Sequence, residues 1–157
     1  MLYSVLVSLF LGPSRKLFLD FTNVRILQTL LSKEISIRVR YHETDGQGRV
    51  HHAQYLNYFE RGRVEMMRSM GFSYKSFEAT GLLLVVRKME IEYLFPAEFD
   101  DELTLTTTVE HARGARIRHS YLLKRDSDNQ QIVIAKSEIA CIDRSGAVRR
   151  LPEYLQS

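Results

Sequence analysis

From residue 82 onward the chain is a succession of strand-type segments, and this pattern limits the fold more than any other feature. Segments rich in β-branched and aromatic residues cover positions 82–95, 102–110, 116–125 and 131–143. The stretches "HARGARIR" and "DSDNQQ" separate the last three segments, and both are typical of hairpin turns. We therefore predict an antiparallel meander in the second half of the chain.

One strand and one helix are predicted before the meander. In "ISIRVRY", residues 35–41, every second residue is apolar, which indicates a half-buried strand. In residues 55–71 apolar side chains recur at helical spacing, and Gly71 is suited to end the helix. The apolar helix face is expected to hold Leu56, Phe59, Met66 and Met70. Gly62 lowers helix propensity, so it indicates either a close approach by a strand or partner, or a tolerated defect.

These elements predict an α+β fold in which the sheet wraps around the helix. The chain has 157 residues, of which 45% are hydrophobic and 26% charged, as in a single globular domain. A net charge of +3 is weaker than that of most nucleic-acid binders, so no nucleic-acid partner is predicted. Cys141 is the only cysteine, which rules out an intrachain disulfide and favours a reducing, cytoplasmic location.

Residues 1–34 lie outside this pattern and are predicted to be an N-terminal extension of a domain at 35–157. The opening "MLYSVLVSLFLG" is shorter than the ~20 residues that span a bilayer, so no integral membrane segment is expected. Residues 17–31 carry apolar side chains at helical spacing. The extension is therefore either a peripheral segment or an amphipathic helix that touches a membrane surface.

The loop before the predicted helix carries the residues best suited to catalysis. Asp45 lies in a glycine-containing turn, seven residues before His52 at the helix entrance. Unpaired N–H groups and the helix dipole at such an entrance stabilise a developing oxyanion. Asp45 is suited to attack a carbonyl or to activate water, and as a weak base of pKa about 3.9 it fits a thioester better than an amide. The alternatives are that Asp45 binds the loop or caps the helix, and that His52 satisfies backbone groups.

The stretch "YHETDGQGRVHHAQYLNYFERGRVE" resembles the signature of hotdog-fold acyl-CoA thioesterases. It is most similar to the 4-hydroxybenzoyl-CoA thioesterase family, and in particular to its Tol-Pal-associated branch. The matching residues are Tyr41, Thr44, Asp45, Gly48, Val50, His52, Tyr55, Leu56, Phe59, Glu60, Arg63 and Glu65. The resemblance extends over residues 35–153, while His51 and residues 47–49 depart from the branch and leave the substrate preference open.

The resemblance implies a five-stranded antiparallel sheet around a central helix, paired into dimers that assemble into a homotetramer with active sites between subunits. Asp45 takes the position of the catalytic carboxylate. At His52 the family supplies a backbone N–H to the thioester carbonyl, with the imidazole as an assisting group. The implied activity is hydrolysis of an acyl-CoA to free acid and coenzyme A, without a cofactor. The alternatives are a non-catalytic acyl-CoA-binding or scaffold protein and a hotdog dehydratase or hydratase.

Three further groups of residues are of types that bind ligands. Val50, Tyr55 and Phe59 are candidates for an acyl pocket, with a place in the core as the alternative. The histidines lack metal-ligand spacing, so no metal site is predicted at His42, His51, His52, His111 or His119. A basic group suits either coenzyme A phosphates or a solvated hairpin, and no contact is assigned to it: Arg113, Arg116 and Arg118, with Lys124 and Arg125 further on.

Overall fold

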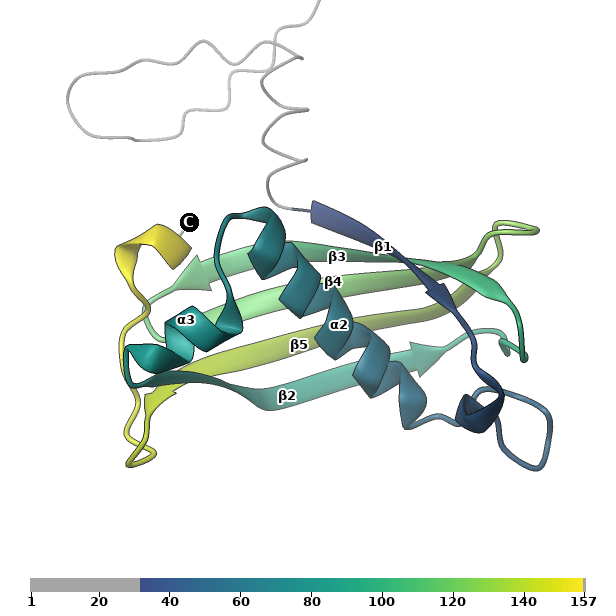
Figure 1. Cartoon of the computed structure of the whole chain (residues 1–157), viewed down its shortest axis with the longest axis horizontal. Coiled ribbons are helices and arrows are strands. Elements are labelled where there is room, and N and C mark those ends of the chain that lie inside the picture. The colour runs from purple at the N-terminus through teal and green to yellow at the C-terminus, as the bar shows by residue number, and fades with distance from the viewer. Residues whose placement is uncertain (1–31, 157) are drawn as a thin grey trace, which may run out of the picture.

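The computed structural model describes residues 32–156, whose strands form one antiparallel sheet (Figure 1). The strands are β1 (Ser32–Arg38), β2 (Leu82–Tyr93), β3 (Glu102–Arg113), β4 (Arg116–Arg125) and β5 (Gln131–Asp143). Their order in the sheet is β1-β3-β4-β5-β2. The predicted meander of β3, β4 and β5 is confirmed. The first strand begins at Ser32 rather than at Ile35, because Ser32 already pairs with Thr108 of β3.

The long helix α2 (Gln54–Ser69) lies across one face of the sheet, as Figure 1 shows. The predicted five-stranded hotdog arrangement, a sheet enclosing one long helix, is therefore confirmed. Three short elements complete the described chain: η1 (Tyr41–Glu43), α3 (Tyr74–Ala79) and η2 (Glu153–Leu155). The sequence pattern did not predict α3, because six residues are too few to show a helical period.

The face that α2 buries differs from the predicted one. Phe59 and Met66 are buried as expected, but Leu56 is 43% exposed and Met70 is 37% exposed. The buried positions are Tyr55, Tyr58, Phe59, Gly62, Arg63, Met66 and Met67. The prediction was wrong at Leu56 and Met70. The helix face toward the sheet includes two tyrosines, a glycine and an arginine, and a pattern based on aliphatic side chains does not detect these residues.

Gly62 allows α2 to pack closely on β3. A Cβ at this position would lie 2.3 Å from Thr107 Oγ1 and 2.9 Å from Leu105 Cδ2, both closer than van der Waals contact. Thr107 and Leu105 are fully buried, so neither side chain has free space to move into. Of the two interpretations of Gly62, the close approach of a strand is confirmed.

The core fills the space between α2 and the sheet in two clusters. One contains Val50, Tyr55 and Phe59, together with buried side chains of β1, β3, β4 and β5. The other contains Met67, Phe77 and Cys141. Within residues 32–156, no helix is long and apolar enough to cross a membrane. The predicted helix of residues 17–31 lies outside the described residues.

Candidate active site

The loop that carries Asp45 folds back on itself between η1 and α2. Thr44 and Val50 form an antiparallel bridge, and within it the Asp45 N–H donates to the Arg49 carbonyl at 2.9 Å. The turn is completed by Gly48, whose N–H donates to the Asp45 carbonyl at 2.9 Å. Gly48 has φ +74°, a left-handed conformation that favours glycine. The backbone therefore holds Asp45 in a defined position across the turn from Arg49.

The Asp45 carboxylate is half-buried and only partly engaged. Its Oδ1 accepts a hydrogen bond from the Gln47 N–H at 2.8 Å, which makes an Asx turn. Its second oxygen accepts no hydrogen bond from the rest of the described chain. The helix N-cap is Ala53, so the alternative that Asp45 caps α2 is wrong. The alternative that Asp45 binds the loop therefore holds for Oδ1, whereas Oδ2 is available to a ligand.

The entrance of α2 offers a free backbone donor at His52. The Ala53 N–H donates to His51 Nδ1 at 3.3 Å, and the Gln54 N–H donates to the His51 carbonyl at 2.8 Å. Among the residues that the structure describes, none accepts a hydrogen bond from the His52 N–H. Because this donor lies next to the positive end of the helix dipole, it is suited to a carbonyl oxygen that gains negative charge.

The imidazoles of His51 and His52 lie side by side, with ring centroids 4.2 Å apart. Neither ring is joined to the Asp45 carboxylate by a hydrogen bond or ion pair in the described part of the chain. The His52 side chain is exposed, while its carbonyl accepts a 3.1 Å hydrogen bond from the Tyr93 hydroxyl of β2. Across residues 32–156, no group of three His, Cys, Asp or Glu side chains is placed to hold a metal ion.

A buried carboxylate, Glu43, lies directly behind the loop and was missed by the sequence prediction. It is 8% exposed, and its Oε2 accepts hydrogen bonds from the Tyr58 hydroxyl at 2.8 Å and the Arg40 N–H at 2.7 Å. Burial, reinforced by this carboxylate, raises the pKa of Tyr58, so the hydroxyl keeps its proton. The Glu43 carbonyl also accepts from the His51 N–H at 2.9 Å. In sequence, its position two residues before Asp45 was the only available signal.

The three predicted acyl-pocket residues are all buried in the core. Val50, Tyr55 and Phe59 are 6%, 3% and 0% exposed. The Phe59 ring packs on Tyr121 with centroids 4.7 Å apart, and the Tyr55 ring contacts Tyr93 at 5.5 Å. Burial raises the pKa of Tyr55 to about 12, so its hydroxyl is uncharged at neutral pH. Their placement agrees with the core alternative, and a role in acyl binding stays a prediction.

A buried polar network that the sequence did not predict lies between α2 and the sheet. Arg63 is 7% exposed and donates a 3.0 Å hydrogen bond to the Tyr121 hydroxyl, which is 2.7 Å from Ser137 Oγ. The His119 ring stacks against Tyr121. Burial, together with the nearby Arg63 charge, lowers the pKa of His119 to about 3, so the imidazole is neutral at ordinary pH. This network joins α2 to β4 and β5 and includes no residue of the Asp45 loop.

A sheet that encloses one long helix, with a carboxylate loop and a free N–H at the helix entrance, defines a hotdog protein with a site suited to acyl transfer. The family model described as the thioesterase-like superfamily matches residues 39–157. The chain therefore belongs to this superfamily.

Known proteins similar to this chain agree with that assignment. The acyl-CoA thioester hydrolase YbgC of Escherichia coli O6:H1 is 36% identical over 107 residues, which cover 68% of this chain and 79% of that protein. The acyl-CoA thioesterase YbgC of Haemophilus influenzae is 36% identical over 110 residues, with 68% and 78% covered. The crystal structure of a probable thioesterase from Bartonella henselae is 39% identical with a TM-score of 0.72, covering 77% of this chain and 99% of that one.

Proposed function

We propose that the loop at the entrance of α2 is the active site of an acyl-CoA thioesterase, with Asp45 as its catalytic carboxylate. The chain hydrolyses an acyl-CoA thioester to free acid and coenzyme A, as the names of its relatives support. One observation carries the site: a single bridged loop presents an Asp45 carboxylate oxygen and leads directly to the His52 N–H, and neither group has a hydrogen-bond partner among residues 32–156.

Asp45 acts on the thioester either as a nucleophile or as a general base that activates water. In both routes a new C–O bond forms at the carbonyl carbon, and the carbonyl oxygen gains negative charge that the His52 N–H stabilises. The C–S bond then breaks, and the electron pair leaves with the coenzyme A thiolate, which takes a proton from solvent. In the nucleophile route water afterwards hydrolyses the acyl–Asp45 anhydride.

The finer assignment is to the Tol-Pal-associated branch of the 4-hydroxybenzoyl-CoA thioesterase family. Its support is the signature between Tyr41 and Glu65, which supplies the bridged loop and the buried face of α2. In this assignment Val50, Tyr55 and Phe59 form the wall behind the acyl group. A panel of aliphatic and aromatic acyl-CoAs tests it, since absence of thiol release from every substrate argues against this family.

The proposed assembly is a homo-oligomer, a dimer or tetramer, built on β2. This strand pairs with β5 on one side, and its other edge is open among the described residues. Val85 and Val86 on this strand are 37% and 51% exposed, and an open, apolar edge favours pairing with a second copy. Val86→Lys is expected to lower the mass measured by light scattering, whereas Val148→Lys, at an exposed site outside β2, is not.

Residues 1–34 are assigned to an extension of the 35–157 domain, in a cytoplasmic protein, and the last three of them already pair with β3 as the start of β1. The pairing of β1 with β3 supports a domain that begins near this boundary, and the single buried Cys141 fits a reducing location. Deletion of residues 1–31 tests the assignment. An unchanged number of subunits per oligomer and unchanged turnover are expected, and loss of folding on deletion contradicts the assignment.

The catalytic role of Asp45 is tested by measuring thiol release from the acyl-CoA panel. Asp45→Asn is expected to lower turnover by about 10²–10⁴-fold, because the amide keeps the bond to the Gln47 N–H but loses the charge. Asp128→Asn is the matched control. The Asp128 carboxylate, in the loop between β4 and β5, accepts from the Gln130 N–H at 3.1 Å in a similar turn and also pairs with Arg125.

The outcomes separate the alternatives. Undiminished release by Asp45→Asn would remove the assigned role from this carboxylate. Absence of release above background on every substrate, with acyl-CoA still bound, would favour the non-catalytic binding or scaffold alternative.

A further inference from the structure

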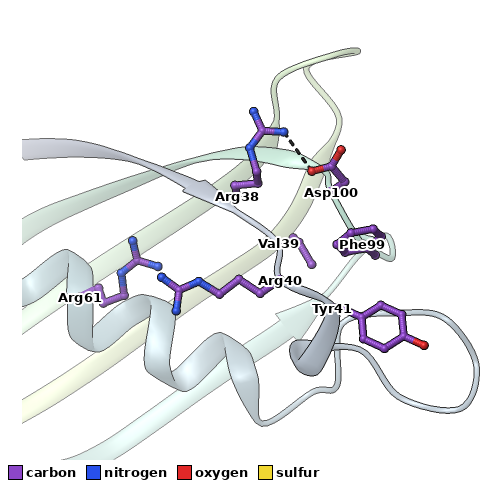
Figure 2. A pocket seen from close by; sticks show the side chains of 7 residues that line it. All are labelled: Arg38, Val39, Arg40, Tyr41, Arg61, Phe99 and Asp100. Atoms are coloured by element: carbon purple, nitrogen blue, oxygen red, sulfur yellow. Dashed lines mark hydrogen bonds and ion pairs between the residues drawn. The ribbon is translucent and has the colours of Figure 1, made fainter.

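A pocket of about 370 Å³ lies beside the proposed active-site loop (Figure 2). Segments far apart in the sequence build it: the end of β1, the start of η1, one turn of α2 and the connection between β2 and β3. Its polar and aromatic lining residues are Arg38, Arg40, Tyr41, Arg61, Phe99 and Asp100. The residues that carry the proposed chemistry are not among them, so the function described above leaves this pocket unassigned.

Two guanidinium groups in the pocket have no acidic partner in the described part of the chain. The side chains of Arg40 and Arg61 point toward each other in Figure 2. Neither side chain forms a hydrogen bond or ion pair with any residue between 32 and 156. Arg38 differs, since it pairs with Asp100 at 3.1 Å and also with Glu102. Because two unpaired like charges repel across the pocket, an anion between them is favoured, and guanidinium groups bind phosphate oxygens in a planar, two-pronged geometry.

An aromatic rim lies next to these charges. Tyr41 is 79% exposed and Phe99 is 55% exposed, with ring centroids 5.6 Å apart in an edge-to-face arrangement. The backbone holds this rim against the end of β1, because the Asp100 N–H donates to the Val39 carbonyl at 3.1 Å. Exposed aromatic faces of this kind stack on planar heterocycles. The pocket thus combines guanidinium groups that can bind a phosphate with aromatic rings that can stack on a nucleobase.

We propose that this pocket binds the phosphorylated adenosine end of a coenzyme A thioester, with phosphates between Arg40 and Arg61 and the adenine against the Tyr41–Phe99 rim. The proposal rests on the proposed thioesterase function. Arg40 precedes Asp45 by five residues, so the backbone separates them by at most about 18 Å, which is within the reach of a phosphopantetheine arm.

The pocket gives the enzyme a means of substrate selection. An acyl carrier protein presents its acyl group on the same phosphopantetheine arm but has no adenosine at the end of that arm. A site that binds the adenosine phosphates therefore favours coenzyme A thioesters over simpler thioesters that share the acyl group and the arm.

The test compares an acyl-CoA with the matching acyl-pantetheine in the full chain. The double variant Arg40→Gln/Arg61→Gln is expected to raise the KM for acyl-CoA about tenfold more than the KM for acyl-pantetheine, because charge-assisted bonds to phosphate are lost. Calorimetry with adenosine 3′,5′-bisphosphate is expected to show a similar weakening of binding. Arg144→Gln is the matched control, because Arg144 is exposed in the turn after β5, at the other end of β2 from the pocket, and it should change neither quantity.

Equal KM changes for the two substrates, or equal bisphosphate binding by native and double-variant protein, would overturn the proposal. Absence of bisphosphate binding by the native chain would do the same. Pyrophosphate that binds as tightly as the bisphosphate would remove the adenine contact. Failure of the proposed function is distinguishable, since it appears as no thiol release from either substrate, whereas bisphosphate binding tests the pocket without turnover.

Discussion

The buried Tyr58 hydroxyl donates a 2.8 Å hydrogen bond to Glu43, a carboxylate two residues before Asp45. Tyr58 belongs to α2 and Glu43 to η1, so this bond fastens the loop to the helix whose entrance presents the His52 N–H. The two groups proposed to act on the thioester are therefore set relative to each other by a pair of residues that lies behind them.

Loss of the Tyr58–Glu43 hydrogen bond is expected to lower kcat and to leave KM nearly unchanged. Tyr58→Phe removes the donor and leaves Glu43 buried with one bond fewer, at a cost of about 1–3 kcal/mol in the free energy of unfolding. We expect kcat to fall about tenfold with little change in KM, since the misplaced loop affects mainly the transition state. Tyr121→Phe, which breaks the separate Arg63 network at similar burial, should cost stability but spare kcat. Equal losses of kcat in the two variants would contradict a positioning role.

The backbone and the ring of His52 can be separated by two substitutions. His52→Ala keeps the N–H and is expected to retain activity within about tenfold, whereas His52→Pro removes it and should cost about 10²–10³-fold in kcat. Ala53→Pro is the control. The Ala53 N–H already donates to His51, so it is not available to a substrate carbonyl, and the φ of −71° at Ala53 suits proline. Circular dichroism establishes that each variant folds. If alanine is as damaging as proline, the imidazole, not the N–H, is the active group.

Gly62→Ala is expected to destabilise the protein although alanine favours a helix by about 1 kcal/mol. The new methyl group would meet Thr107 Oγ1 at 2.3 Å, and such overpacking costs about 1–3 kcal/mol. Thr107→Ala removes that oxygen, so the double variant should recover part of the loss. Urea unfolding of the two single variants and the double variant measures this coupling. Strictly additive effects would show that the contact is not the cause.

His119 makes stability depend on pH in a defined direction. Its pKa is about 3 in the folded protein and near 6.5 when unfolded, so the unfolded chain binds this proton first as the pH falls. The contribution of His119 to the free energy of unfolding is therefore fully present above about pH 6.5. It falls by up to about 1.4 kcal/mol per pH unit as the pH decreases toward 3. His119→Phe keeps a ring against Tyr121 and lacks this slope. Parallel stability curves for the two proteins between about pH 7 and pH 5, measured by urea unfolding, would refute the assignment.

The secondary structure of this chain was largely predictable from short stretches of sequence. Residue alternation over 131–143, the hairpin at Gly114 and the end of α2 before Gly71 depend on preferences that act within a few residues. The hotdog fold and the importance of Asp45 followed from the resemblance of the loop signature to hotdog thioesterases. The helix α3 was not predicted, because a segment of six residues is too short to show a helical period.

Only the tertiary structure decided which side chains meet. Nothing near Tyr58 in the sequence indicates that Glu43 accepts its hydroxyl, and the same holds for Arg40 and Arg61, whose facing charges come from different elements. The buried face of α2 likewise includes Arg63, because Tyr121 and Ser137 on the sheet provide a polar surface beneath the helix. Local preferences set where strands, turns and helices occur, whereas contacts between distant segments depend on sheet order and packing, which no short stretch of sequence contains.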